Sequence, residues 1–327
     1  MYHFAARIIF LSLIVCSVLL VSCKKDSERF VPDNDQALDS AWSVTIPSNA
    51  QVHQLAARLL GKVFVKTLNP TLDSVLETDN GLRIQLPGKF LVLPGMVTTL
   101  TEVKSEYVMI RKLGDYVRYG VPSQAGMYPL ETRGAVFLNL TSNNQPVSIA
   151  AEKSILIQFY ETDTKPGMNV FYGSRNGFSN TSGFNWVPAN DYPQLGVWDS
   201  VNPVRKGYHL SIRHGGLIQV GKYIETASAR TKVSVVLPNL FSNCNTSVYM
   251  AFKNIRSIVR LDGDASLRTF GSSNIPINEE VLFFSISKIG DSYYLGKLDQ
   301  RTTAGMLAVV KPVLVELNTI QSFLDGL

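Results

Sequence analysis

The chain has 327 residues, of which 45% are hydrophobic and 17% are charged. This composition excludes an intrinsically disordered chain and leaves room for two domains of ordinary size. Lysine and arginine outnumber aspartate and glutamate by 31 to 26, but the excess is spread thinly along the chain. A nucleic-acid-binding protein needs a concentrated basic patch, so we expect no nucleic-acid partner.

An apolar segment lies near the start of the chain. Arg7 precedes the run IIFLSLIVCSVLLV at 8–21. The run is shorter than the roughly 20 apolar residues of a transmembrane helix, and it has the size of the hydrophobic region of a signal peptide. We predict a signal peptide over residues 1–22, with an uncleaved signal anchor or an ordinary signal peptide as the alternatives.

The end of this segment, Leu20-Val21-Ser22-Cys23, resembles the lipobox of bacterial lipoproteins. The resemblance implies cleavage before Cys23 and lipidation of its thiol, and two or more acyl chains hold a protein stably to a membrane. Residues 23–43 are polar and aperiodic, which predicts a flexible tether. The charges of Lys24-Lys25-Asp26 resemble those that follow the lipidated cysteine in surface-exported lipoproteins of Bacteroidetes. We therefore expect an outer-membrane location, with the cell surface favoured over the periplasm.

From about residue 44 onward, short β-branched and aromatic runs alternate with turn residues. Three runs place apolar side chains at every second position: GLRIQLP at 81–87, AVFLNLT at 135–141 and SILIQFY at 154–160. A period of two marks half-buried strands, and many such strands with few helical stretches predict antiparallel sandwiches. The segment AQVHQLAARLL at 50–60 fits either a short helix or the entry to a strand.

Residues 161–206 differ from the rest because they are dense in Gly, Asn, Ser and Pro and contain two of the three tryptophans. We predict an all-β fold of two antiparallel β-sandwich domains in tandem, at 44–165 and 206–327, joined by an aromatic connector at 166–205. A short helix should close the chain, with Asn318 as its N-cap and Gly326 as its stop.

Several segments resemble a lipoprotein family of Bacteroidetes that has no established activity. They include DNGLRIQLPGKFLV, LETRGAVFL, KPGMNVFYG and NIPINEEVLFFSISKIGDSYYLGK. The resemblance covers nearly the whole chain. It implies that the first sandwich is distantly similar to a ZU5 domain and that a second β-rich domain follows.

The connector has the composition of a ligand-binding face. Stacked rings supply apolar area and polar side chains supply directed hydrogen bonds. The candidate ligand-binding residues are Tyr172, Arg175, Trp186, Tyr192 and Trp198. The alternative, which we favour, is that the rings hold the connector between the two sandwiches.

Patterns for catalysis or metal binding are absent from the sequence. His53, His209 and His214 belong to no zinc motif, and Asp262-Gly263-Asp264 lacks the spacing of a calcium loop and reads as solvated acids in a hairpin turn. The nucleophile motif G-x-S-x-G does not occur. We therefore expect no catalytic residue, no metal and no cofactor.

The leading hypothesis is a non-enzymatic binding, adhesion or scaffold module, with a glycan or an envelope protein as its partner. The first alternative is a glycan-binding accessory protein of a polysaccharide uptake system. The second is a hydrolase that uses connector carboxylates, for which Asp163, Asp191 and Asp199 are the candidates.

Overall fold

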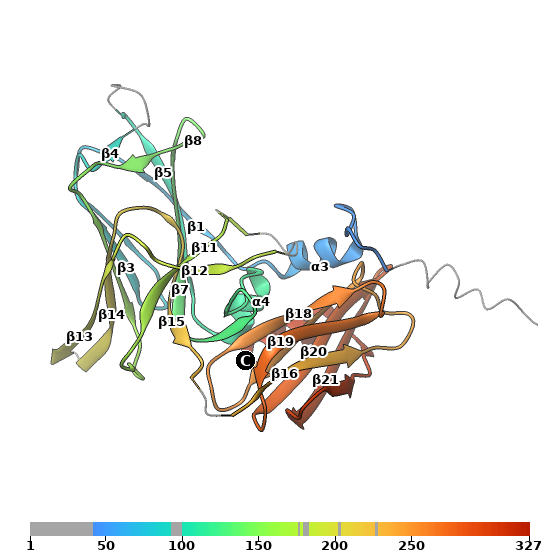
Figure 1. Cartoon of the computed structure of the whole chain (residues 1–327). Helices are drawn as coiled ribbons and strands as arrows, with labels where there is room; N and C mark the ends of the chain where they lie inside the picture. Colours follow the sequence, from blue (N-terminus) through green and yellow to red (C-terminus); the bar gives the residue numbers. More distant parts are fainter. Residues whose placement is uncertain (1–41, 93–99, 176, 179–182, 202–203, 226–227) are drawn as a thin grey trace, which may run out of the picture. The chain divides into compact units, whose positions relative to one another are not determined.

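The computed structural model describes residues 42–92, 100–175, 177–178, 183–201, 204–225 and 228–327. The predicted signal peptide, the lipidation site Cys23 and nearly all of the predicted tether lie outside these residues. The chain from Trp42 to Leu327 forms one compact unit. Most of its elements are strands in mostly antiparallel sheets (Figure 1). The last element is a short helix. The predicted all-β class, the antiparallel sheets and the C-terminal helix are confirmed.

Two sheets form the first sandwich. The first sheet has the order β1 (Phe64–Leu68), β5 (Val103–Ile110), β7 (Tyr128–Ser142), β15 (Gly216–Tyr223), β11 (Asn169–Gly173) and β12 (Trp186–Pro188), with β6 (Gln124–Ala125) and β8 (Gln145–Pro146) also paired to β7. The second sheet has the order β13 (Gln194–Val201), β14 (Val204–Ile212), β10 (Ile155–Tyr160), β3 (Leu82–Leu86) and β2 (Ser74–Glu77). A separate small pair joins β4 (Leu91–Val92) to β9 (Ser148–Ile149).

The alternating runs supply the core between these two sheets. Leu82, Ile84 and Leu86 of β3 are almost fully buried in one apolar cluster, together with Ile157 and Phe159 of β10. The polar residues between them are partly or fully exposed. The period of two therefore predicted the inner face of the second sheet correctly.

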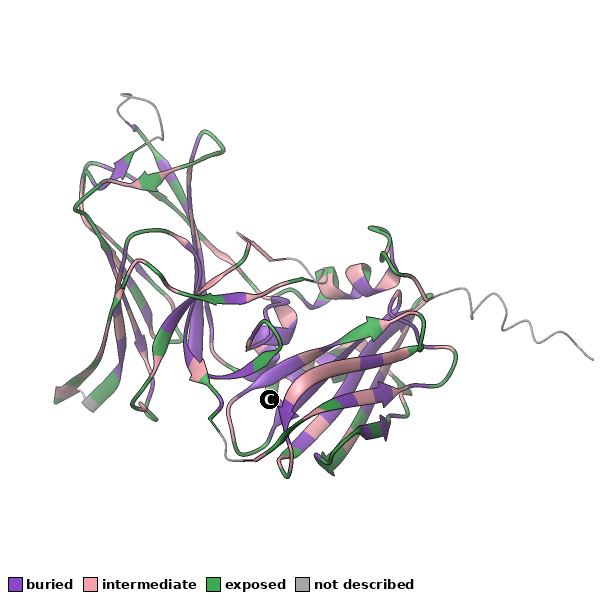
Figure 2. Ribbon diagram, in the orientation of Figure 1, coloured by how far each residue is buried: buried purple, intermediate pink, exposed green. Residues whose placement is uncertain are grey.

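The strand β7 differs from this pattern, because both of its faces are buried (Figure 2). Val136 and Leu138 point into the core of the first sandwich, whereas Ala135 and Phe137 belong to a different cluster on the outer side of the first sheet. The half-buried strand predicted at 135–141 is therefore wrong, since a second layer covers its outer side.

A third sheet is formed by the C-terminal strands. Its order is β22 (Met306–Val309), β16 (Arg230–Val236), β19 (Thr269–Pro276), β18 (Ile258–Asp264), β17 (Thr246–Phe252), β20 (Glu280–Ile289), β21 (Ser292–Arg301) and β23 (Val313–Val315). The pairing of β16 with β22 is parallel. The start of β18 pairs with β17 and its end pairs with β19. One apolar cluster joins Val233 of β16 to Phe283 of β20, so the two halves of the sheet enclose a common core.

The first sandwich extends further along the chain than the predicted boundary between residues 205 and 206. That boundary falls inside β14, which pairs with β10, and β15 pairs with β7. Residues 166–205, suggested by the sequence to be a connector, contribute β11, β12 and β13 to the two sheets. The alternation of apolar and polar residues shows which side chains face a core, but it does not show which strands pair. The turn-rich composition was therefore the only signal for a domain boundary.

Three helices lie in a shared core between the outer side of the first sheet and the third sheet. They are α3 (Gln51–Leu59), α4 (Leu113–Arg118) and α5 (Leu317–Asp325). Their apolar side chains form one cluster with residues of both sheets, among them Phe137 and Phe284. Within the described residues, no helix is long and apolar enough to span a membrane.

Local details of these helices correct one prediction and settle another. The segment predicted at 50–60 contains a helix, Gln51–Leu59, rather than a strand entry, because Val52, Leu55 and Leu59 recur at helical spacing and are buried. In α5 the N-cap is Glu316, so the prediction of Asn318 as the cap is wrong, while Gly326 is the C-cap as predicted. Helices α4 and α5 contact closely, since a Cβ atom on Gly114 would lie 1.8 Å from the Leu324 carbonyl oxygen.

A partly buried arginine connects the first sandwich to the third sheet. Arg256, which precedes β18, places Nη1 2.6 Å from Oε2 of Glu161 and also donates to the Arg111 carbonyl. Its own carbonyl accepts a hydrogen bond of 2.8 Å from the Thr132 amide. Arg256 therefore contacts three segments of the first sandwich at once.

The described chain begins with a fixed attachment to the third sheet. The rings of Trp42 and Phe270 lie 5.0 Å apart between centroids. Ser43 and Asn243 form two hydrogen bonds, from the Ser43 amide to Oδ1 (3.0 Å) and from Nδ2 to the Ser43 carbonyl (2.6 Å). Trp42 and Ser43 are thus held against the third sheet.

Candidate ligand-binding site

Two of the five predicted binding residues have packing roles: Trp186 in β12, and Arg175 just after β11. Trp186 is fully buried in the shared core, and its Nε1 donates a hydrogen bond of 2.9 Å to the Pro122 carbonyl. The guanidinium of Arg175 lies 4.9 Å from the centroid of the Phe184 ring and donates to the Gly120 carbonyl at 2.9 Å. Trp186 therefore offers no ring face to a ligand.

Tyr172 belongs to a second, separate cluster. Its hydroxyl donates to Oδ1 of Asp191 at 3.0 Å, and Nε2 of His214 lies 3.4 Å from Oδ2 of the same carboxylate. Burial, together with the nearby carboxylate, raises the pKa of the Tyr172 hydroxyl, so Tyr172 stays neutral at physiological pH. Tyr192, the next residue after Asp191, is 91% exposed.

The three candidate carboxylates of the hydrolase hypothesis have different surroundings. Asp191 binds Tyr172, Asp163 lies 2.8 Å from Nη1 of Arg133 in an ion pair, and Asp199 lies on the edge strand β13. Across the described ranges, no three His, Cys, Asp or Glu side chains gather in a group that could hold a metal ion.

Trp198, the last of the predicted binding residues, lines a pocket on the outer face of the second sheet. Because Phe159 and Tyr208 point into the core, the adjacent Tyr160 and Gly207 point outward. The strand register places Gly207 between Trp198 on one side and Tyr160 on the other. With no side chain between them, the two rings approach to 5.5 Å between centroids at an angle of 53°.

The Trp198 ring is held in place by its own polar atom. Its Nε1 donates a hydrogen bond of 3.1 Å to the Tyr208 carbonyl. Gly207 is required at its position, because a Cβ atom there would lie 1.9 Å from the Phe159 carbonyl oxygen. The sheet backbone therefore fixes the ring, and a ligand would find it already oriented.

These rings belong to a depression of about 460 Å³ that we call the aromatic pocket. Its charged side chains come from three strands and a turn. The Arg205 guanidinium lies 4.8 Å from the Tyr160 ring centroid and also donates to the Tyr160 hydroxyl. Arg83 forms an exposed ion pair of 3.5 Å with Glu77. The full lining is Glu77, Thr78, Asp79, Gly81, Leu82, Arg83, Gln158, Tyr160, Trp198, Ser200 and Arg205.

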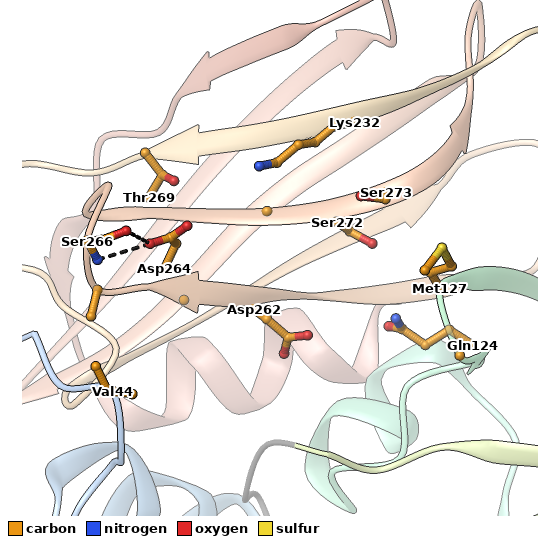
Figure 3. Close-up of a pocket in the computed structure, with 14 residues that line it drawn as sticks. Val44, Gln124, Met127, Lys232, Asp262, Asp264, Ser266, Thr269, Ser272 and Ser273 are labelled. Atoms are coloured by element: carbon orange, nitrogen blue, oxygen red, sulfur yellow. Dashed lines mark hydrogen bonds between the residues drawn. The ribbon is translucent and has the colours of Figure 1, made fainter.

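A polar groove of about 740 Å³ lies along β18 and β19. Figure 3 shows Gln124 and Met127 at one end and Val44 and Ser266 at the other. Its lining contains hydroxyls, Lys232 and two aspartates, but no aromatic ring. The groove can therefore form hydrogen bonds to a ligand but offers no stacking surface.

The two aspartates of the groove were expected in a hairpin turn, but both lie in β18. Asp264 ends the strand and accepts hydrogen bonds from the Ser266 amide and hydroxyl, at 3.0 and 2.6 Å. Asp262 lines the groove. Partial removal of water by the surrounding protein raises the pKa of its carboxyl, and the nearby charge of Arg260 opposes part of this effect. The prediction of a turn containing both acids is therefore wrong, because the turn begins only after Asp264.

Sequence reasoning identified Trp198 but missed Tyr160, Arg83 and Arg205 as its neighbours. The strand run at 154–160 contained a usable signal, since two of its outward positions, Gln158 and Tyr160, line the pocket. Tyr160 and Trp198 are brought together only by the pairing of β10, β14 and β13, which the sequence did not predict.

Comparison with known proteins gives no functional lead. No model of a protein family matches the chain. No match to a curated protein was found either. The geometry of the aromatic pocket is therefore the main basis for a functional proposal.

Proposed function

We propose that the protein is a lipid-anchored lipoprotein of the outer membrane, exposed at the cell surface, which acts as a non-enzymatic binding module. Its ligand is a glycan, bound in the aromatic pocket. The lipobox-like sequence ending at Cys23 and the resemblance to Bacteroidetes lipoproteins support the anchor and the location. The pocket built around Trp198 is the single observation that supports the ligand class.

The chemistry of the aromatic pocket suits a sugar. The apolar face of a pyranose ring can stack on an indole ring, while its hydroxyls need both donors and acceptors. Arg83 and Arg205 supply donors, Glu77 and Asp79 supply acceptors, and Gln158 supplies both. Its volume lies within the range of typical small-molecule sites. A role in adhesion or in polysaccharide uptake would use this same site.

Replacing Trp198 by alanine should weaken glycan binding by about tenfold or more, because the stacking surface is lost. The measurement is calorimetric titration of the purified full-length protein with ligands selected on a glycan array. Tyr192→Ala is the matched control, since it removes an exposed aromatic side chain outside the pocket and should leave affinity unchanged. Equal affinities of Trp198→Ala and the native protein, or a native protein that binds no glycan, would contradict the proposal.

Replacing Cys23 by alanine should release the protein from the membrane fraction, because the thiol that carries the lipid is absent. Fractionation of cells that express either form measures this directly. Protease added to intact cells should degrade the native protein, as expected for a surface location. If native protein is degraded only after the outer membrane is broken, it faces the periplasm, and the surface assignment is wrong.

A further inference from the structure

We propose that the aromatic pocket selects sugars that carry a carboxylate, and that Arg205 is the group that binds this carboxylate. The inference rests on the proposed function, because it names the class of glycan held at the same site. It follows from the pairing of charges in the pocket, from the placement of the Arg205 guanidinium and from the position of that guanidinium relative to Trp198.

The charged groups of the aromatic pocket are only partly paired. Two arginines and two carboxylates line it. Arg83 and Glu77 form an ion pair with each other at 3.5 Å. Arg205 forms no ion pair with any residue that the structure describes. It is therefore the cation of this pocket for which a ligand can supply the counter-charge.

The guanidinium of Arg205 is held in place, but not all of its N–H donors are used in hydrogen bonds to the described residues. It lies over the Tyr160 ring and donates one hydrogen bond, to the hydroxyl of that same residue. A guanidinium has five N–H donors, and among the described residues no second acceptor for Arg205 is found. The free donors of a planar guanidinium match the two oxygens of a carboxylate, which favours a bidentate contact.

The strand register places this cation beside the stacking ring. Arg205 is opposite Ser200, two residues along β13 from Trp198, and two residues along β14 from Gly207. Alternation of side chains therefore puts Trp198, Ser200 and Arg205 on the same outer face. A sugar ring stacked on Trp198 would present a carboxylate substituent to Arg205.

The other carboxylate of the lining is compatible with an acidic sugar. Asp79 lies in the turn between β2 and β3, next to the strand that carries Arg83. A carboxylate in this position can accept hydrogen bonds from sugar hydroxyls, as carboxylates do from any hydroxyl donor. The pocket thus offers an acceptor for hydroxyls on the β2–β3 side and a cation for an acid group on the β13–β14 side.

The test compares each acidic oligosaccharide with its own carboxyl-reduced form. The probes are tetrasaccharides of galacturonic, glucuronic and mannuronic acid and an N-acetylneuraminic acid oligosaccharide, titrated into the full-length protein. For at least one pair, the acidic form should bind about tenfold more tightly or better, and the difference should shrink as salt is raised. The Arg205→Gln variant should lose about ten- to a hundredfold in affinity for that acidic form, and clearly less, only a few-fold, for the reduced form, which loses a donor to a hydroxyl but no counter-charge.

Two further variants control for folding and for charge. Arg213→Gln removes an exposed arginine from the segment between β14 and β15, outside the pocket, and should bind both forms like the native protein. Arg205→Lys keeps the charge without the planar fork and should fall between the native protein and Arg205→Gln.

The outcomes separate this inference from the proposed function. If acidic and reduced forms bind equally and Trp198→Ala weakens both, the glycan site stands and the carboxylate selectivity is overturned. If Arg205→Gln keeps the acidic preference, the assignment of Arg205 is overturned. If the native protein binds no acidic probe but does bind neutral glycans, the selectivity fails alone, and if it binds no glycan at all, both proposals fail.

Discussion

Replacement of Trp186 by alanine is expected to lower the free energy of unfolding by about 3–5 kcal/mol, the usual cost of deleting a large buried aromatic side chain. Trp186 is fully buried in the shared core and packs edge-on against Phe184 at 5.0 Å. The substitution leaves a cavity and removes one of the two hydrogen bonds to the Pro122 carbonyl, which keeps only the Gln124 amide as a donor. Urea unfolding followed by circular dichroism measures the change.

Two comparisons make the Trp186 result specific. Trp186→Phe keeps most of the ring volume and should cost clearly less than Trp186→Ala. Trp198→Ala removes the same side chain from the half-buried outer face of the second sheet and should also cost less. If Trp186→Ala kept native stability but lost glycan affinity, the packing role would be wrong and the sequence-based assignment of Trp186 to a binding face would be right.

Replacement of Arg256 by alanine is expected to destabilise the protein by about 3–5 kcal/mol, because it leaves the carboxylate of Glu161 buried without a counter-charge. The side chain of Glu161 is 5% exposed and that of Arg256 is 25% exposed. The Arg111 carbonyl also loses its donor. Thermal and urea unfolding of the variant and the native protein give the difference.

The control for Arg256 is an ion pair of similar length at the surface. Arg301 lies 2.8 Å from Glu280, with both side chains about half exposed, at 59% and 48%. Arg301→Ala should cost no more than about 1 kcal/mol, because water screens the pair. The double variant Arg256→Ala with Glu161→Gln should recover part of the loss. Equal effects of Arg256→Ala and Arg301→Ala would show that Arg256 contributes no more than a surface charge.

Much of the fold could be predicted from the sequence, because the alternation of apolar and polar residues in a half-buried strand shows which side chains face the core. Leu82, Ile84 and Leu86 are an example, since each is buried and the residues between them are not. Strand partners could not be predicted in this way. The run GLIQVGKY at 216–223 looked like a strand of the second sandwich, but it pairs with β7 of the first, more than 70 residues earlier in the chain.

The candidate site could be predicted only in part, for the same reason. Composition pointed to the aromatic residues of 166–205, but it could not separate Trp186 in the shared core from Trp198 at the aromatic pocket. The difference between the two tryptophans depends on the packing around their strands: β12 is covered by the shared core, whereas the outer face of β13 is not. Arg205 sits only at the end of the predicted connector, and its contact with Tyr160 comes from the pairing of β14 with β10.

The attachment of Trp42 and Ser43 to the third sheet has a mechanical consequence. If Cys23 holds the chain to a membrane, as we propose, tension from the anchor enters the fold at Trp42, through its contacts with Phe270 and Asn243. Tension from a bound glycan would enter at the second sheet, which belongs to the first sandwich. The load path between the two points crosses the shared core and the Arg256–Glu161 pair. These contacts therefore lie in series with the lipid anchor and the glycan site, and the weakest of the three would set the force at which the attachment fails.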